Sequence, residues 1–140
     1  RNQFKGTGYD KLTQEWLVSA KGRVIWGTPV SAVGSYGPDF EDPSGEGSAY
    51  HVYSGQPAAP GSQGRLPWLK QLDLGVSYRP SAAEGRLGFN LDVFNVFNSQ
   101  VTLWKSPYSE LDPGQPDPLY GAATVRQAPR SLRVSVSYDY

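Results

Sequence analysis

At the end of the chain, from Leu132 to Tyr140, apolar and polar side chains alternate at every position. A period of two places the two kinds of side chain on opposite faces of a β-strand. The alternation lasts nine residues, and a tilted strand needs roughly 9 to 11 residues to cross a bilayer. We therefore expect a long strand whose apolar, lipid-facing side carries Leu132, Val134, Val136, Tyr138 and Tyr140.

Three upstream segments repeat this alternation: EWLVSAKGRVIWGTPVSAVG, WLKQLDLGVSYRP and LGFNLDVFNVFNSQVTLW. The segment NQFKGTGYD is a weaker candidate, because Phe4 and Tyr9 fall on opposite faces. Between Phe94 and Phe97 apolar residues fall on both faces, which a bulge or a partly apolar contact in a lumen would explain. These patterns predict strands near residues 2–11, 15–30, 68–79, 86–103 and 130–140.

The connections between the expected strands alternate in length. Short links occur at DKLTQE and RPSAAEG, whereas 36–66 and 105–129 are far longer than usual hairpin loops. Outer-membrane barrels alternate short periplasmic turns with long extracellular loops. Helical spacing is absent, and the 16 glycines and 12 prolines would interrupt most helices. The sequence therefore predicts an all-β, antiparallel part of a transmembrane β-barrel, with two long extracellular loops and Tyr140 in the periplasm.

Composition argues against several other classes of protein. Lys plus Arg and Asp plus Glu are balanced at 13 each, so no basic field indicates nucleic acid. Cysteine is absent and His51 is the only histidine. No Ser-His-Asp or paired-carboxylate arrangement can be assembled, so we expect no enzyme activity, no cofactor and no metal site. The chain begins at Arg1 and contains no methionine, which indicates a fragment.

The segments GRLPWLKQLDLGVSYRP, GRLGFNLDVFNVFNSQ and DPLYGAATVRQAPRSLRVSVSYDY occur in this order along the chain. Together they resemble the C-terminal barrel of TonB-dependent outer-membrane receptors, specifically the Oar-like group. The most specific motifs are DVFNVFN, at residues 92–98, and QAPRSLR, at residues 127–133, with the terminal aromatic residue. The resemblance covers nearly the whole chain and is strongest from Gly64 onward.

This resemblance implies a barrel of about 22 strands closed by an N-terminal plug, of which the chain would supply about five strands and no plug. It implies energy-coupled uptake of a scarce nutrient across the bacterial outer membrane, with the substrate unknown. The implied partners are outer-membrane lipid, the TonB complex through absent N-terminal parts, the barrel assembly machinery and an unknown small ligand. Tyr140 would end the strand that the assembly machinery recognises, and it would also serve as an interfacial anchor.

The first long loop contains two segments with candidate binding residues. In the first long loop, AYHVYSG gathers Tyr50, His51 and Tyr53, which are candidate ligand contacts unless they only pack within the loop. The acidic segment GPDFEDPSGEGS suggests a calcium site, but it lacks EF-hand spacing, and solvated loop charge is the usual explanation.

Parity along the strands assigns a set of charged residues to the lumen. The residues expected to face the lumen are Lys21, Arg23, Asp73, Asp92, Arg133 and Asp139.

Two other functions compete with transport. In a soluble β-sandwich module, tryptophans or the loop tyrosines would face a ligand or glycan. Such a module has strands of about 5 or 6 residues, shorter than the periodic segments here. An adhesin-like surface protein of the outer membrane would use the long loops instead. The tryptophans concerned are Trp16, Trp26, Trp68 and Trp104.

Overall fold

The computed structural model describes residues 2–34, 51–112 and 114–140. Apart from one 3-10 turn, η1 (Ser81–Ala83), the regular structure of these residues is β, and the strands pair antiparallel. Within the same ranges, no helix has the length and apolar character needed to span a membrane. The strands are β1 (Gln3–Lys11), β2 (Trp16–Ile25), β3 (Val52–Tyr53), β4 (Gln56–Pro57), β5 (Leu69–Tyr78), β6 (Leu87–Phe94), β7 (Thr102–Lys105), β8 (Glu110–Asp112), β9 (Gln115–Pro116), β10 (Ala123–Arg126) and β11 (Ser131–Tyr138).

The chain divides into two compact units. Unit 1 comprises Arg1–Trp26, Trp68–Gln100 and Gln127–Tyr140. Unit 2 comprises Gly27–Pro67 and Val101–Arg126. The long alternating strands all belong to unit 1, and both long connections lie mainly in unit 2.

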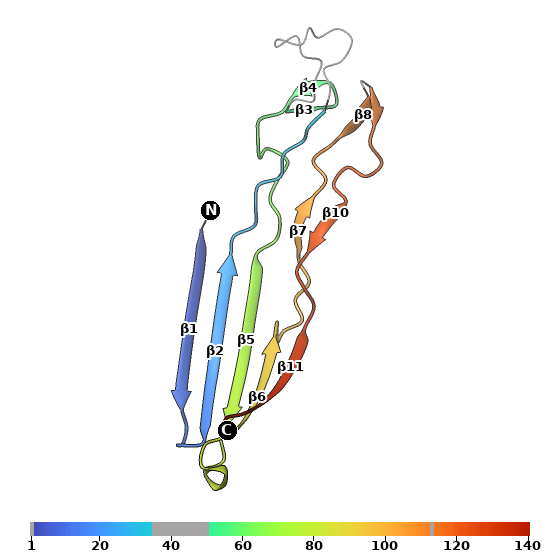
Figure 1. Ribbon diagram of the computed structural model, residues 1–140. Coiled ribbons are helices and arrows are strands. Elements are labelled where there is room, and N and C mark those ends of the chain that lie inside the picture. Colours follow the sequence, from blue (N-terminus) through green and yellow to red (C-terminus); the bar gives the residue numbers. More distant parts are fainter. Residues whose placement is uncertain (1, 35–50, 113) are drawn as a thin grey trace. The chain divides into compact units, whose positions relative to one another are not determined.

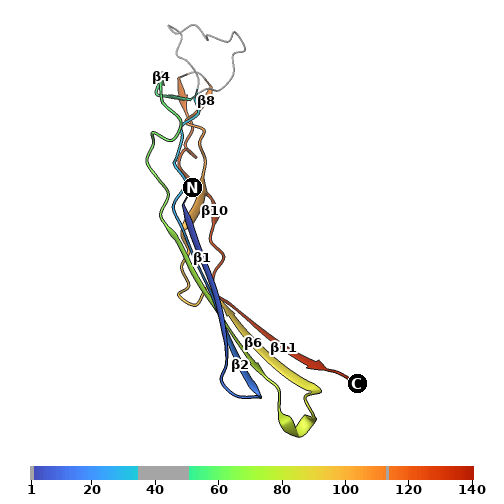
Figure 2. The ribbon, with the colours of Figure 1, turned by 90° about the vertical axis from the view of Figure 1, so that its left-hand side faces the viewer.

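Unit 1 is a five-stranded sheet in the order β1-β2-β5-β6-β11, so that each long strand pairs with the next along the chain (Figure 1). Thr13 fixes the turn between β1 and β2, because its Oγ1 accepts hydrogen bonds from the backbone N–H of Glu15 at 3.2 Å and of Trp16 at 3.1 Å. The sheet twists, as β-sheets generally do, from β1 to β11 (Figure 2). In the described residues it stays open, with β1 and β11 as its edges.

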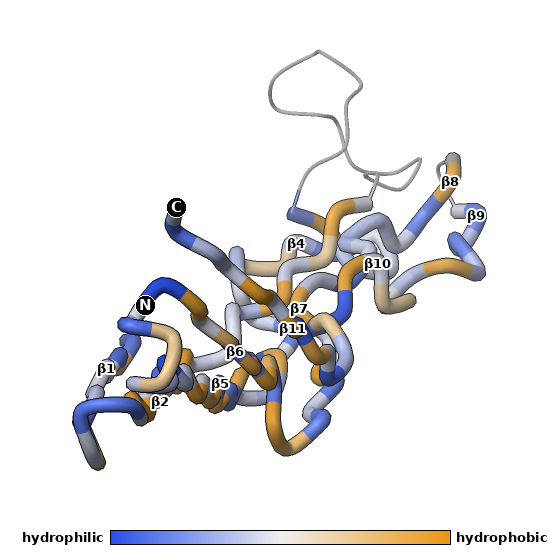
Figure 3. The backbone as a smooth tube through the Cα atoms, turned by 60° about the horizontal axis from the view of Figure 1, so that its bottom comes forward, coloured by the Kyte–Doolittle hydropathy of each residue, from blue (hydrophilic) through white to orange (hydrophobic). Residues whose placement is uncertain are grey.

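The register carries the sequence alternation across the whole sheet. Val76 on β5 lies opposite Val18 on β2 and also opposite Leu91 on β6, which in turn faces Val134 on β11. Residues directly opposite one another in antiparallel strands point to the same face of the sheet. The apolar positions of successive strands therefore form one continuous face, and Figure 3 shows apolar and polar positions interspersed along these strands.

The observed strand ends agree with the predicted ones at three strands and correct the other two. The predicted strand 15–30 was too long, because β2 ends at Ile25 and Gly27 and Pro29 follow. The predicted strand 86–103 was also too long, because β6 ends at Phe94. The three expected strands that match closely are 2–11, 68–79 and 130–140, which correspond to β1, β5 and β11.

A tight turn follows β6, and the register slips by one residue there, as at a bulge. The backbone N–H of Val96 donates to the carbonyl of Leu72 at 2.8 Å, where the β5–β6 register would place Asn95. Asn95 and Asn98 both have φ at +52°, a left-handed conformation that asparagine adopts more readily than most residues. The backbone N–H of Asn98 donates to the carbonyl of Asn95 at 2.8 Å and closes the turn. The apolar residues between Phe94 and Phe97 therefore do not continue one extended strand.

Unit 2 contains short strand pairs, most of them within the stretches predicted as long loops. The pairs β3 with β4 and β8 with β9 lie in those loops, whereas β7, which pairs with β10, overlaps the end of the predicted strand 86–103. A small core holds this unit together, with Val52 at 0% and Ala32 at 1% exposure. The buried Ser109 hydroxyl donates to the carbonyl of Val33 at 3.1 Å. The long connections thus include regular structure that period-two reasoning did not predict.

Candidate functional site

The apolar face of the five-stranded sheet is uncovered in the described chain. Leu132 and Val134 on β11 are 69% and 73% exposed. Phe89 and Leu91 on β6 are 41% and 43% exposed. Monomeric soluble proteins rarely leave contiguous apolar surface of this kind in water, so the face is a candidate contact surface for another apolar phase.

Aromatic residues bound this apolar face at both ends. Near one end Trp16 stacks on Tyr78 with ring centroids 4.4 Å apart. Tyr78 in turn stacks on Phe89, with ring centroids 6.3 Å apart. Near the other end Trp26 stacks on Trp68 with centroids 5.4 Å apart. All five residues continue the parity of the apolar face, since they follow the register of β2 with β5 and of β5 with β6.

The distance between the two aromatic groups along β2 can be compared with the height of the apolar band in outer-membrane barrels. Trp16 and Trp26 stand ten residues apart in the sequence. At about 3.3 Å per residue they are separated by about 33 Å along the strand. A strand tilted by about 40° would then span about 25 Å of membrane, the height of the apolar band in outer-membrane barrels.

The opposite face of the sheet is polar and internally hydrogen bonded. The guanidinium of Arg23 donates to Gln71 Oε1 at 2.7 and 3.1 Å. Gln71 Nε2 donates to the carboxylate of Asp73 at 2.8 and 3.1 Å. Asp73 Oδ1 in turn accepts the backbone N–H of Asn95 at 2.9 Å. These hydrogen bonds give partners to the charged groups of Arg23 and Asp73, and they connect β2, β5 and the turn after β6.

An ion pair continues the polar face at the β6–β11 end. Arg133 donates to Asp92 Oδ2 from Nη2 at 2.8 Å and from Nε at 3.0 Å. The guanidinium also lies 5.3 Å from the ring centroid of Phe94, within cation–π range. Next to this pair, Ser77 Oγ donates to Asn90 Oδ1 at 2.6 Å.

The residues predicted to face the lumen therefore share one face within the strands. Lys21 lies opposite Asp73 in the register, and Asp92 lies opposite Arg133. Asp139 follows the end of β11, and its backbone N–H donates to the carbonyl of Arg86 at 2.9 Å. The predicted lipid-facing residues of β11 occupy the other face, and Tyr140 follows that strand, fully exposed.

The two most specific sequence motifs contact one another. Asn95, 2% exposed, donates from Nδ2 to the carbonyls of Ser99 and Ala128, each at 2.8 Å. Its Oδ1 accepts the backbone N–H of Ser99 at 3.1 Å. Asn98 Oδ1 accepts the backbone N–H of Arg130 at 2.9 Å. The DVFNVFN and QAPRSLR segments thus form a polar clamp at the point where β6 ends and β11 begins.

Gln127 adds a link between this clamp and β5. Its side chain is 4% exposed, and Nε2 donates to the carbonyl of Lys70 at 3.2 Å. Neither Asn95 nor Gln127 was among the predicted site residues. The available clue was their place in the two motifs, but the period-two pattern does not tell which motif residues turn inward.

The predicted loop contacts are only partly described. Tyr50 and the acidic residues of GPDFEDPSGEGS lie outside the described residues. His51 is exposed, and its carbonyl accepts the backbone N–H of Ala58 at 2.7 Å. Tyr53 packs on Tyr120 with centroids 5.5 Å apart. Burial, with a smaller effect of Tyr53, raises the pKa of Tyr120 above its usual 10.0.

Comparison with known proteins adds no assignment. No family model, no curated protein and no solved structure matches this chain. In the part of the chain that the structure describes, no group of three or more histidine, cysteine or acidic residues is arranged to hold a metal ion. The two-faced sheet is therefore the feature on which a functional assignment rests.

Proposed function

We propose that this chain is part of the wall of a TonB-dependent transporter in the bacterial outer membrane. The apolar face of β1, β2, β5, β6 and β11 would contact lipid, and the polar face would line the lumen. The observation that carries the proposal is the apolar face bounded by stacked aromatic residues at both ends. Such aromatic girdles mark the two membrane interfaces of outer-membrane barrels.

The connectivity supports the same proposal. Consecutive long strands pair antiparallel and stop at two open edges, so further strands on either side would extend the sheet toward a closed barrel of about 22 strands. The short turns at 12–15 and 79–86 would face the periplasm. The connections in unit 2 would be extracellular, so the Trp26–Trp68 pair would lie at the outer interface.

The transport activity itself is proposed from the resemblance of the motifs to Oar-like receptors. The polar clamp gives these motifs a physical role at the end of β6, which supports reading them as a structural pattern of one family. Energy coupling and the plug would reside in parts other than this chain. The substrate class stays open among metal complexes, cobalamin, saccharides and peptides.

The observations favour this proposal over a glycan-binding sandwich. A sandwich needs a second sheet of similar size to cover the apolar face. The other described sheets are two-stranded, and the longest of their strands has four residues. Trp16 pairs with Tyr78 near one end of the sheet face and Trp26 pairs with Trp68 near the other, so these three tryptophans do not form one platform.

Tryptophan quenching by brominated lipid tests the membrane assignment. Variants that keep a single tryptophan would be reconstituted in vesicles whose acyl chains carry bromine. Emission from Trp16 or Trp68 should be quenched, whereas emission from Trp104 should not, since Trp104 would lie in an extracellular connection. Equal emission of all three variants in brominated and ordinary lipid would contradict the assignment of the apolar face.

Uptake measurements test the transport assignment separately. The gene would be deleted in its host, and growth would be compared with each candidate nutrient as the limiting source. Loss of growth on one class, with accumulation that stops when the proton gradient is collapsed, is the expected result. Unchanged uptake with loss of surface attachment would favour the adhesin alternative.

A further inference from the structure

The charges on the polar face of unit 1 are unevenly distributed among its strands. Every charged residue that β1 and β2 place on this face is a cation, and the residues concerned are Lys5, Lys11, Lys21 and Arg23. Asp10, the acidic residue in these two strands, has the opposite parity and lies on the apolar face. The other three strands place both signs on the polar face, where Asp92 pairs with Arg133. An excess of positive charge is therefore confined to the β1–β2 hairpin.

Three of these cations, Lys5, Lys21 and Arg23, lie next to one another and form a cationic patch. The register sets Lys5 directly opposite Arg23, and Lys21 follows two positions away on β2. Residues directly opposite in an antiparallel pair have Cβ atoms about 4.5–5.5 Å apart, and like charges at such positions destabilise a sheet. Among the described residues, none of the three takes part in an ion pair. The cationic patch thus lowers the stability of the hairpin unless an anion lies over it.

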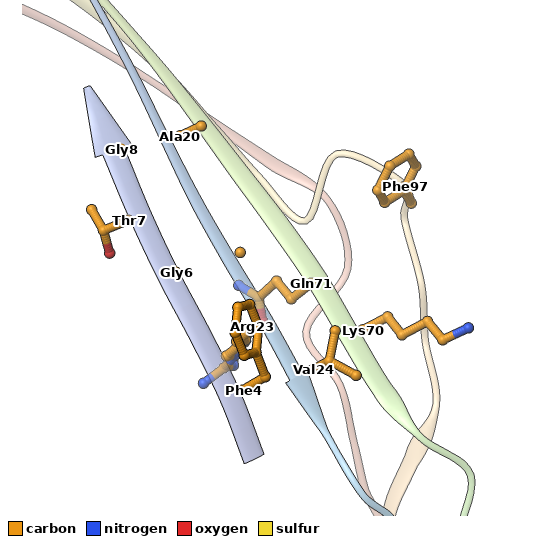
Figure 4. Close-up of a pocket in the computed structure, with 11 residues that line it drawn as sticks. Phe4, Gly6, Thr7, Gly8, Ala20, Arg23, Val24, Lys70, Gln71 and Phe97 are labelled. Carbon is orange, nitrogen blue, oxygen red and sulfur yellow. Dashed lines mark hydrogen bonds between the residues drawn. The ribbon is translucent and has the colours of Figure 1, made fainter. Parts of the chain in front are cut away.

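The carboxylate nearest in the register does not neutralise the cationic patch. Asp73 lies opposite Lys21, but its oxygens accept hydrogen bonds from Gln71 and from the backbone of Asn95. Arg23 likewise donates to the neutral amide of Gln71, whose side chain extends from β5 toward β2 (Figure 4). Three cations therefore adjoin one carboxylate whose hydrogen bonds go to other groups, and the patch keeps a net positive charge.

The cationic patch is accessible from the polar side of the sheet. Lys5 and Lys21 are exposed, and Arg23 is half-buried. Thr7 and Tyr9 follow Lys5 on the same face of β1 and are also exposed. Their hydroxyl groups can donate hydrogen bonds to anionic oxygens. Cationic side chains on the wall of a passage are the means by which anion and phosphate pores select their solutes.

We propose that the cationic patch binds the transported substrate and that this substrate carries carboxylate or phosphate groups. The inference rests on the proposed function, in which the polar face of β1 and β2 borders the lumen. A cluster of cations binds a solute with several anionic oxygens better than a neutral solute, because each contact is a charge-assisted hydrogen bond. A polyanionic substrate is therefore favoured over neutral saccharides and neutral peptides.

Charged thiol reagents measure the electrostatic potential at the cationic patch. Thr7 lies opposite Lys21 and two positions from Lys5, so Thr7→Cys places a reporter there in the full-length protein in detergent. An anionic methanethiosulfonate should modify this cysteine about tenfold faster than its cationic counterpart, because a cationic surface raises the local concentration of anions. Combining Lys5→Gln with Lys21→Gln should remove the preference.

Competition then tests whether the cationic patch binds an anionic solute. Citrate and tripolyphosphate are the polyanionic probes, and sucrose is the neutral one. At constant ionic strength, which keeps screening equal, either polyanion should slow the modification of Thr7→Cys, and sucrose should not.

Two matched variants separate the cationic patch from charge elsewhere. Lys70→Gln removes a cation whose side chain extends away from β1 and β2 (Figure 4), so it should leave the preference intact. Ser135→Cys moves the reporter to the polar face of β11, two positions from Arg133. Because Arg133 is paired with Asp92, the anionic and cationic reagents should modify Ser135→Cys at similar rates.

The possible results distinguish the anion site from the proposed function. Equal rates with the two reagents at Thr7→Cys, or no protection by either polyanion, would overturn the anion site and leave the proposed function standing. Reaction at Ser135→Cys without reaction at Thr7→Cys would show that another part of the protein covers the cationic patch, which would also overturn the site. Absence of reaction at both positions would contradict a solvent-accessible lumen, and with it the proposed function.

Discussion

At the scale of single residues, Asn95 both follows the end of β6 and holds two other segments of unit 1. It ends β6 by adopting a left-handed backbone and then uses both ends of its amide to hold Ser99 and Ala128. Aspartate in its place would lose the two donors, and alanine would lose all three bonds. Glycine would keep the backbone conformation without the bonds.

Substitution of Asn95 is therefore expected to destabilise the sheet. Asn95→Ala should lower the free energy of unfolding by about 1 to 3 kcal/mol for each buried group left without a partner. Asn95→Gly should be less harmful, because only the hydrogen bonds are lost. Thermal unfolding in detergent measures both variants, and an Asn95→Ala protein as stable as the wild type would refute the role assigned to the clamp.

The two faces of β11 give a second residue-scale prediction. Val134→Arg places a charge on the apolar face and should cost about 2 to 4 kcal/mol near the bilayer midplane. Ser135→Arg places the same charge at the neighbouring position on the polar face and should be well tolerated. Yield of assembled protein in the outer membrane compares the two variants. Equal assembly would reject the facing of β11.

At the scale of elements, the two short turns of unit 1 are tied together. The backbone N–H of Ser81 donates to Glu15 Oε1 at 2.7 Å, and the N–H of Arg79 donates to the carbonyl of Glu15 at 2.8 Å. Hydrogen bonds from the side chain and backbone of Ser81 lower the pKa of Glu15 below its usual 4.5. The β1–β2 turn and the β5–β6 turn therefore depend on an ionised Glu15 for part of their contact.

The contact between the two turns should weaken as the pH falls. Because the folded-state pKa is lowered, the contact is fully present above pH 4.5 and is lost as the pH falls through the lowered pKa. Hydrogen exchange at the Ser81 amide should accelerate over that interval, after correction for intrinsic rates. Glu15→Gln should remove the pH dependence, while Glu84→Gln, which breaks an exposed pair with Arg86 in the same turn, should leave it intact.

At the scale of the whole molecule, the orientation of the connections can be tested cleanly because the chain has no cysteine. Ser62→Cys and Gln115→Cys lie in connections that would be extracellular, so both should react with an impermeant maleimide on intact cells. Ala82→Cys, in the β5–β6 turn, should react only after permeabilisation. The reverse pattern would invert the proposed topology.

The open sheet also has consequences for residues 1–140 alone. The edges β1 and β11 present unpaired backbone groups beside an exposed apolar face, a combination that promotes association between sheet edges. In water this chain should form large particles by light scattering, and it should disperse only in detergent. A monodisperse monomer with a cooperative thermal transition would contradict the barrel-wall proposal and favour a self-contained soluble domain.

The sequence by itself determined the all-β class, the approximate positions of the long strands and the division of their residues between two faces. These features follow from a local rule, since successive side chains of a strand point to opposite sides whatever the strand pairs with. The expected grouping of Asp73, Asp92 and Arg133 on one face follows from the same rule.

Only the tertiary structure decided which residues meet across strands. The stacking of Trp26 on Trp68 and the bond from Asn95 to Ala128 join positions far apart in the chain, and each depends on the register that turn geometry and the burial of one sheet face set between strands. The predicted strand ran past Phe94 because the apolar phase of β6 resumes at Val101 and Leu103, whereas the left-handed backbone at Asn95 turns the chain after Phe94.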